Sequence, residues 1–134
     1  MEALIDTDIL FLYLKGNKTV EAKFKSYLND YGKLNFSVLS YDEITETLND
    51  NKAIKQLNDF TELSRYNNII PLTVNSIEIA AGLYSIAKSL KNPFDDISIL
   101  IAAICMENNF KLITRQADYF GRISSLVVED WSGI

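Results

Sequence analysis

Acidic side chains recur in this sequence where an apolar segment ends or a new one begins. They are Asp6, Asp8, Glu43, Asp95, Asp96 and Asp118. Any one of them alone could simply cap the free N–H groups at the start of a helix. Gathered at one place, however, such carboxylates would repel one another and would require a counter-ion. Because Mg²⁺ and Mn²⁺ favour sites made only of oxygen ligands, these acids predict a candidate metal site.

The residue types that are missing or rare narrow the chemistry further. The 134 residues include no His, which excludes Ser-His-Asp and Cys-His catalysis and the usual zinc sites. The single Cys105 lies in an apolar helical pattern and cannot form an internal disulfide, so we expect a buried thiol and a reducing cytoplasm. A net charge of −5 argues against a broad basic surface for nucleic acid, although it allows a local basic rim.

Apolar patterns predict strands and helices that alternate along the chain. The expected strands are 3–6, 33–40, 68–73, 110–114 and 126–131. The expected helices are 8–16, 19–31, 40–63 with a break near 49–51, 75–90 and 95–107, with "KNPF" at 91–94 before the last. Ser40 is the expected N-cap of the third helix, with Glu43 in the capping-box position. Such alternation predicts a single domain over 1–134, a three-layer α/β/α fold with a central parallel sheet of about four to five strands.

In an open parallel sheet, sites form outside the carboxyl ends of the strands. Four polar residues at these ends are candidate substrate contacts: Thr7, Ser40, Thr114 and Arg115. Their hydroxyl and guanidinium groups could hydrogen-bond a phosphate. For Thr7 and Ser40, an ordinary role as helix caps is the better explanation of the hydroxyl, and the Arg115 guanidinium could equally belong to the solvated surface.

Four segments of the chain resemble the successive blocks of PIN-domain ribonucleases, and most of all the VapC-type toxins of toxin–antitoxin pairs. These segments are "LIDTDILFLYL", "FSVLSYDEI", "ILIAAICMENNFKLITR" and "VVEDW", and together they run from about Ala3 to Trp131. The resemblance implies a Mg²⁺-dependent endoribonuclease, with Mn²⁺ as a substitute, that hydrolyses RNA phosphodiester bonds. It also implies a protein antitoxin as partner. A surplus of apolar side chains in the first two helices would suit a homodimer or that antitoxin, and no segment is long enough to span a membrane.

The resemblance assigns two acids directly and leaves two open. Asp6 matches the family's first acid and Glu43 its second. At the third position the chain has Ser98, and either of two upstream acids could replace the missing carboxylate. Asp96 fits by motif, whereas Asp95 lies one helical turn before Ser98 and fits by geometry.

The fourth acid of the family is also replaced. The matching position after the fourth strand is Gln116, and Asp118 is the candidate substitute. The resemblance therefore implies catalysis by Asp6, Glu43 and either Asp96 or Asp95, with Asp118 as a further metal ligand.

Two other functions compete with this hypothesis. A PIN fold with a weakened acidic site could serve as a binding or regulatory module, and Ser98 and Gln116 favour that alternative. A receiver-type phosphoacceptor domain also pairs acids after its first strand, but it needs an Asp at the end of the third. The sequence there is Pro71-Leu72-Thr73, which argues against a receiver.

Overall fold

The structure is a computed structural model that describes residues 1–90 and 93–133. Its elements, in chain order, are β1 (Ala3–Ile5), α1 (Thr7–Leu14), α2 (Lys18–Tyr31), β2 (Asn35–Ser37), α3 (Val38–Asp50), α4 (Ile54–Arg65), β3 (Asn68–Ile70), α5 (Val74–Ala87), α6 (Asp96–Asn108), β4 (Lys111–Ile113), α7 (Ala117–Phe120) and β5 (Val128–Glu129). Two residues of the "KNPF" segment, at 91 and 92, and the last residue of the expected domain lie outside the described residues.

The strands form one parallel sheet in the order β3-β2-β1-β4-β5. The central strand β1 is buried on both faces, and successive side chains point to opposite sides, as strand geometry requires. Ala3 and Ile5 belong to one core cluster and Leu4 to the other. An unbroken apolar strand is therefore the form that a sheet covered on both faces requires.

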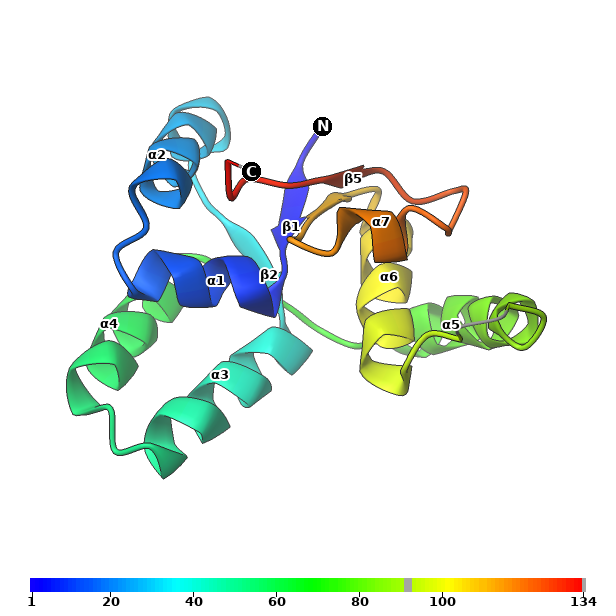
Figure 1. Cartoon of the computed structure of the whole chain (residues 1–134), viewed down its shortest axis with the longest axis horizontal. Helices are drawn as coiled ribbons and strands as arrows, with labels where there is room; N and C mark the ends of the chain where they lie inside the picture. The colour runs from blue at the N-terminus through cyan, green and yellow to red at the C-terminus, as the bar shows by residue number, and fades with distance from the viewer. Residues whose placement is uncertain (91–92, 134) are drawn as a thin grey trace.

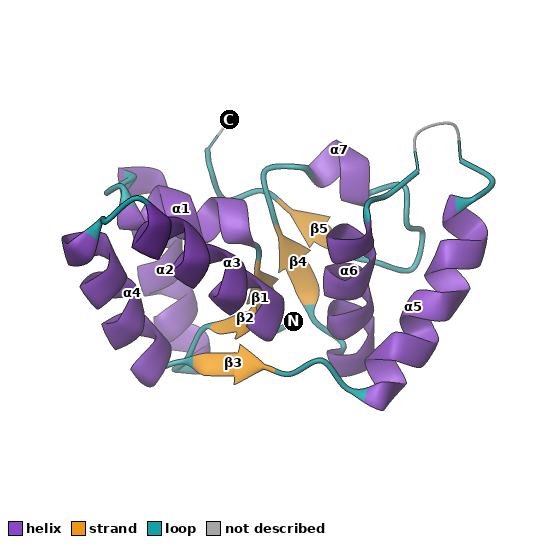
Figure 2. Ribbon diagram, turned by 90° about the horizontal axis from the view of Figure 1, so that it is seen from below, coloured by secondary structure: helices purple, strands orange, loops and turns teal. Residues whose placement is uncertain are grey.

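Helices cover the two faces of the sheet in separate groups. Helices α1 to α4 supply the core on one side, and α5 to α7 supply it on the other, with the strands between them (Figure 2). This arrangement confirms the predicted three-layer α/β/α architecture with its parallel sheet. Within the two described ranges, no helix is both long and apolar enough to cross a bilayer.

The start of α3 differs from the prediction. Ser37, and not Ser40, is the N-cap, and its hydroxyl accepts a hydrogen bond from the Ser40 backbone N–H at 3.0 Å. The expected strand 33–40 consequently ends three residues early, because the chain turns directly from β2 into α3. The expected break near 49–51 is confirmed, since α3 ends at Asp50 and α4 begins at Ile54.

The boundaries of the helices beside β1 and β4 position the acids. Asp6 is the N-cap of α1, and Gly16, with a φ of 84°, follows the end of that helix in a conformation that favours glycine. Asp95 is the N-cap of α6, and its side chain accepts a hydrogen bond from the Ser98 N–H. Both caps lie at helix starts, where carboxylates are favoured.

Candidate active site

A cavity of about 420 Å³ lies at the carboxyl edge of the sheet, beside the first turns of α1, α3 and α6. Figure 1 shows the starts of α1 and α3 next to the end of β1. The side chains that line the cavity are Asp6, Thr7, Asp8, Phe11, Glu43, Asp95, Ile97, Ser98, Ile101, Gln116 and Phe120. The set holds four carboxylates, and no lysine or arginine of the described chain is among them.

Asp6 is the most deeply buried of these carboxylates, with 6% of its surface exposed. Its Oδ1 accepts a hydrogen bond from the Thr7 N–H, and its Oδ2 accepts one from the Thr114 hydroxyl, both at 2.8 Å. Burial raises the pKa of Asp6 to about 7, and the negative charge of Asp8 adds to this shift. Asp6 is therefore a carboxylate that the fold holds in place at an electrostatic cost.

Asp8 projects from the first turn of α1 toward the loop after β4. Its Oδ2 accepts a hydrogen bond from the Arg115 backbone N–H at 3.1 Å and lies 3.4 Å from the Thr114 hydroxyl. Its Oδ1 is buried and has no hydrogen-bond partner in the described chain. Burial raises the pKa of Asp8, against the opposing effect of the Arg115 and Ile9 N–H groups.

Glu43 and Asp95 complete the acidic lining from α3 and α6. Burial raises the pKa of Glu43, and the charges of Asp95, Asp42 and Asp8 raise it further. Asp95 behaves differently, because hydrogen bonds outweigh the effect of its burial and lower its pKa. The donors are the N–H and hydroxyl of Ser98, at 2.8 and 2.9 Å, and the Tyr119 hydroxyl at 3.3 Å.

The small hydroxyls near the acids connect α1 to α3. The Thr7 hydroxyl donates to the Ser40 hydroxyl at 2.9 Å, and the Ser37 hydroxyl donates to the same oxygen at 3.3 Å. Thr7 lines the cavity, whereas Ser40 is buried behind it. Thr114 is fully buried, and its hydroxyl also accepts a hydrogen bond from the Gln116 N–H at 3.1 Å. Of these hydroxyls, that of Thr114 contacts the acids directly, because it donates to Asp6.

Three of the sequence candidates point elsewhere. Asp96 is exposed at the start of α6, and its side chain interacts with Tyr84 of α5. Asp118 is exposed on α7, and neither residue lines the cavity. Arg115 is exposed as well, and its contribution to the site is its backbone N–H. Of the two alternatives for the third acid, the structure brings Asp95 to the cavity.

Two polar residues have contacts at the site that the sequence analysis did not assign. Asp8 was identified only as an acid, and its spacing of two residues from Asp6 was the available signal. Tyr119 donates to Asp95, and its hydroxyl accepts a hydrogen bond from the Asp95 N–H at 3.0 Å. No local pattern predicts that contact, because the two residues are 24 positions apart and on different elements.

The types of side chain in the cavity suit a hard divalent cation, but the carboxylates lie too far apart to surround one ion. Within residues 1–90 and 93–133, no group of three acidic, Cys or His side chains lies close enough together to hold one ion. The cavity nevertheless offers carboxylate, hydroxyl and amide oxygens, which are the kind of ligand that Mg²⁺ and Mn²⁺ prefer. The unpartnered buried Oδ1 of Asp8 fits a role in holding a cation, since a buried carboxylate oxygen without a donor is costly.

Comparison with solved structures identifies the fold. A chain in the VapBC2 complex from Rickettsia felis, bound to a DNA fragment from its promoter, has a TM-score of 0.88 at 17% identity, over 98% of this chain and 99% of that chain. A chain in DNA-bound VapBC from Salmonella typhimurium has 0.87 at 14% identity, over 98% of both chains. A chain in VapBC-1 from nontypeable Haemophilus influenzae has 0.81 at 22% identity, over 98% of this chain and 99% of that one.

Sequence comparison agrees with the fold. No curated protein gives a significant match to the chain. The family model described as "PIN domain" matches residues 3–126, which include β1 to α7 and the acids that line the cavity. The resemblance predicted from four short segments is thus confirmed over nearly the whole sequence, and the chain belongs to the PIN domain family.

Proposed function

We propose that this protein is a metal-dependent endoribonuclease and acts as the toxin of a toxin–antitoxin pair. One observation carries the proposal: four carboxylates from β1–α1, α3 and α6 line one cavity with no lysine or arginine of the described chain among them. Such a set is expensive to maintain without a cation, because each negative charge raises the cost of the others. Membership of the PIN domain family supports a nuclease.

The chain's own side chains would bind and orient the metal. Asp6 and Glu43, with Asp95, supply carboxylate oxygens, and Thr114 holds the Asp6 carboxylate through its hydroxyl. Held by these residues, Mg²⁺ or Mn²⁺ would supply the polarisation of a phosphate and a lowered pKa for an attacking water. Ser98 and Gln116 offer uncharged polar groups in the same cavity, where they could position a phosphodiester.

The partners follow from the same proposal. The similar structures are toxin–antitoxin complexes, which supports an antitoxin protein as partner of this chain. Exposed apolar side chains on α5 support a protein contact, with Val74 at 78% and Ile77 at 47% exposure, and we propose a homodimer as well. The unpaired Cys105 is compatible with a reducing cytoplasm, where we place the activity.

Asp6→Asn tests the enzymatic hypothesis directly. We expect the variant to lose RNA cleavage in Mg²⁺ while it keeps its fold, because Asn preserves the shape of Asp6 but removes its charge. Asp30→Asn is the control, since Asp30 is exposed on α2 and its substitution removes the same charge elsewhere. Full cleavage by the Asp6→Asn variant, or cleavage by the wild type in a chelator, would contradict the proposal.

The weakened binding module is the second candidate, and the absence of a three-acid cluster in the described chain favours it. The same assay separates the two functions. A binding module would not cleave RNA with Mg²⁺ or Mn²⁺, although it would still bind its antitoxin. Asp95→Asn and Asp96→Asn then identify the third acid: we expect only the Asp95 variant to lose metal affinity and cleavage together.

A further inference from the structure

Among the carboxylates that line the described cavity, Asp8 has a buried oxygen, Oδ1, without a hydrogen-bond partner. We infer that Asp8 is a direct ligand of the divalent cation and supplies, from α1, the carboxylate that the loop after β4 lacks. This inference rests on the proposed function, because it names a residue that would hold the metal of that same site. The evidence for the inference is the difference between the hydrogen bonds of the Asp6 carboxylate and those of the Asp8 carboxylate.

Asp6 has a donor for each of its oxygens. The Thr7 N–H binds Oδ1 and the Thr114 hydroxyl binds Oδ2, each at 2.8 Å. The Thr114 hydroxyl has one hydrogen, so it can donate to one carboxylate at a time. Its distance to Asp8 Oδ2 is 3.4 Å, which makes Asp6 its better acceptor.

Asp8 has a donor for only one of its oxygens. Its Oδ2 accepts from the Arg115 backbone N–H, whereas Oδ1 is buried and has no hydrogen-bond partner among the described residues. The nearby Ile9 N–H acts on the carboxylate electrostatically but makes no hydrogen bond with Oδ1. An unpartnered carboxylate oxygen in a cavity with three other acids is stabilised by a cation, and within the described lining no side chain supplies one.

Asp8 lies beside the loop after β4, which contributes no carboxylate of its own to the cavity. Its hydrogen bond to the Arg115 N–H places it directly against the loop that leads from Thr114 to Gln116. This loop contributes an amide side chain to the cavity, at Gln116, and its nearest acid in sequence, Asp118, is exposed outside the cavity. A carboxylate from α1 therefore lies beside the stretch of backbone where the loop itself offers none.

Mn²⁺ binding by the full-length chain tests the inference without an activity assay. Calorimetric titration and the Mn²⁺-induced rise in melting temperature are measured for the wild type, Asp8→Asn and the control Asp30→Asn. The amide oxygen introduced by Asp8→Asn can still accept the Arg115 N–H, so we expect the metal-free variant to fold. We expect Asp8→Asn to weaken Mn²⁺ binding by about tenfold or more, and the control to match the wild type.

A ligand exchange distinguishes direct contact from a general charge effect. In an Asp8→Cys variant, a thiolate would replace the carboxylate, and thiolates favour soft metals over Mn²⁺. We expect this variant to prefer Cd²⁺ and to show a thiolate-to-Cd²⁺ charge-transfer band in the ultraviolet. Asp30→Cys, with an isolated exposed thiol, should show neither.

The outcomes separate this inference from the proposed function. Loss of Mn²⁺ affinity in Asp8→Asn together with the Cd²⁺ band in Asp8→Cys supports Asp8 as a ligand. If the wild type and Asp8→Asn bind Mn²⁺ equally, the inference is overturned and the metal-dependent function stands. If the wild type binds no divalent cation, both are overturned. If Asp8→Asn loses affinity but Asp8→Cys shows no band, Asp8 acts through charge alone and the ligand role is overturned.

Discussion

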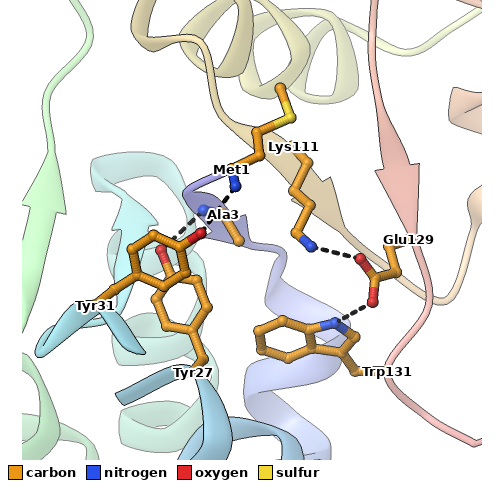
Figure 3. A network of polar contacts seen from close by, with 7 residues as sticks. All are labelled: Met1, Ala3, Tyr27, Tyr31, Lys111, Glu129 and Trp131. Atoms are coloured by element: carbon orange, nitrogen blue, oxygen red, sulfur yellow. Dashed lines mark hydrogen bonds and ion pairs between the residues drawn. The ribbon is translucent and has the colours of Figure 1, made fainter. Parts of the chain in front are cut away.

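Two polar regions of the molecule differ in how their carboxylates are neutralised. The first is the cavity at the carboxyl edge, where carboxylates gather without a cation from the described chain. The second, which we call the α2 network, joins α2, β1, β4 and β5 through Met1, Ala3, Tyr27, Tyr31, Lys111, Glu129 and Trp131 (Figure 3).

In the α2 network, each polar group meets a complementary one. The Lys111 ammonium binds Glu129 Oε2 at 2.7 Å, and the Trp131 indole N–H binds Oε1 of the same carboxylate at 2.9 Å. The Tyr27 hydroxyl accepts the N–H of Ala3 at the start of β1. The hydrogen bond from Lys111 lowers the pKa of Glu129, whereas burial raises those of Asp6, Asp8 and Glu43 in the cavity.

The difference separates stability from function. A satisfied network holds the strands and α2 together and leaves nothing for a ligand to bind. An unsatisfied one lowers stability and is retained where a ligand restores the balance, as a metal would do here. The pKa of Asp6 is raised and that of Glu129 is lowered, and these opposite directions provide measurements that could break or sharpen this contrast.

The largest expected effect is the pH dependence of the cavity. The pKa of Asp6 is raised from an ordinary 3.8 to about 7, so the folded chain binds this proton more tightly than the unfolded chain does. Stability is then highest below pH 4 for this group and falls as the pH rises toward 7, by a total on the order of 4 kcal/mol. Urea unfolding of the metal-free protein between pH 4 and 8 measures it.

Asp6→Asn is the control for this pH effect. Because the variant cannot ionise at this position, its stability should change much less over the same range and should exceed that of the wild type at pH 8. Saturating Mg²⁺ should recover part of the loss in the wild type alone. A wild-type curve that rises from pH 4 to 7 would contradict the electrostatic account of the cavity.

The next effect comes from adding a carboxylate to the cavity. Ser98→Asp places an acid where the resemblance to PIN-domain ribonucleases implies one, and we expect it to tighten Mn²⁺ binding by about tenfold, or ~1.4 kcal/mol. Without metal, the new charge lies beside Asp95 and should lower the melting temperature. Calorimetry and thermal unfolding, each with and without Mn²⁺, separate the two effects.

Ser98→Ala is the matched control, because it removes the hydroxyl bond to Asp95 without adding charge. We expect it to lower stability slightly and to leave Mn²⁺ affinity near the wild-type value. Equal Mn²⁺ affinity in Ser98→Asp and Ser98→Ala would show that position 98 does not contact the metal.

The sequence predicted the layers of the fold and the edge that bears the acids, because both depend on local patterns. Apolar strands followed directly by acids, as at Ile5 and Asp6, can be identified from neighbouring residues alone. The choice between Ser37 and Ser40 as the cap of α3 could not, because the two serines are three residues apart and equally able to cap. In the structure Ser37 is the cap, and the Ser40 hydroxyl accepts instead from Thr7 of α1, a contact between elements that local sequence does not reveal.

The third acid shows the same limit. Asp95 and Asp96 are adjacent, and the one that reaches the cavity depends on which residue begins α6. Asp95 is extended, with φ −73° and ψ 163°, and its backbone N–H and carboxylate are tied to Tyr119 of α7. That short helix was not predicted, because it spans only four residues, Ala117–Phe120. The N-cap bonds from Ser98 are local, whereas the contact with Tyr119 joins distant elements, and both hold Asp95 at the cavity.

The smallest expected effect concerns the α2 network, whose carboxylate is paired with a lysine. Lys111→Met keeps the apolar stem but removes the ammonium that binds Glu129. Since the Glu129 side chain is 41% exposed, solvent screens the pair, and we expect the free energy of unfolding to fall by about 0.5–1 kcal/mol at pH 7. The lowered pKa of Glu129 means that this contribution is present above its ordinary 4.5 and is lost as the pH falls through the folded value.

Lys55→Met provides the comparison, because the Lys55–Asp59 pair lies on one helix with side chains 91% and 52% exposed. We expect that substitution to cost about 0.3 kcal/mol or less. Mn²⁺ affinity should be unchanged in both variants, since neither lysine lines the cavity. If Lys111→Met altered metal binding as strongly as it altered unfolding, the two regions would be coupled through β4, and the separation of stability from function along this strand would fail.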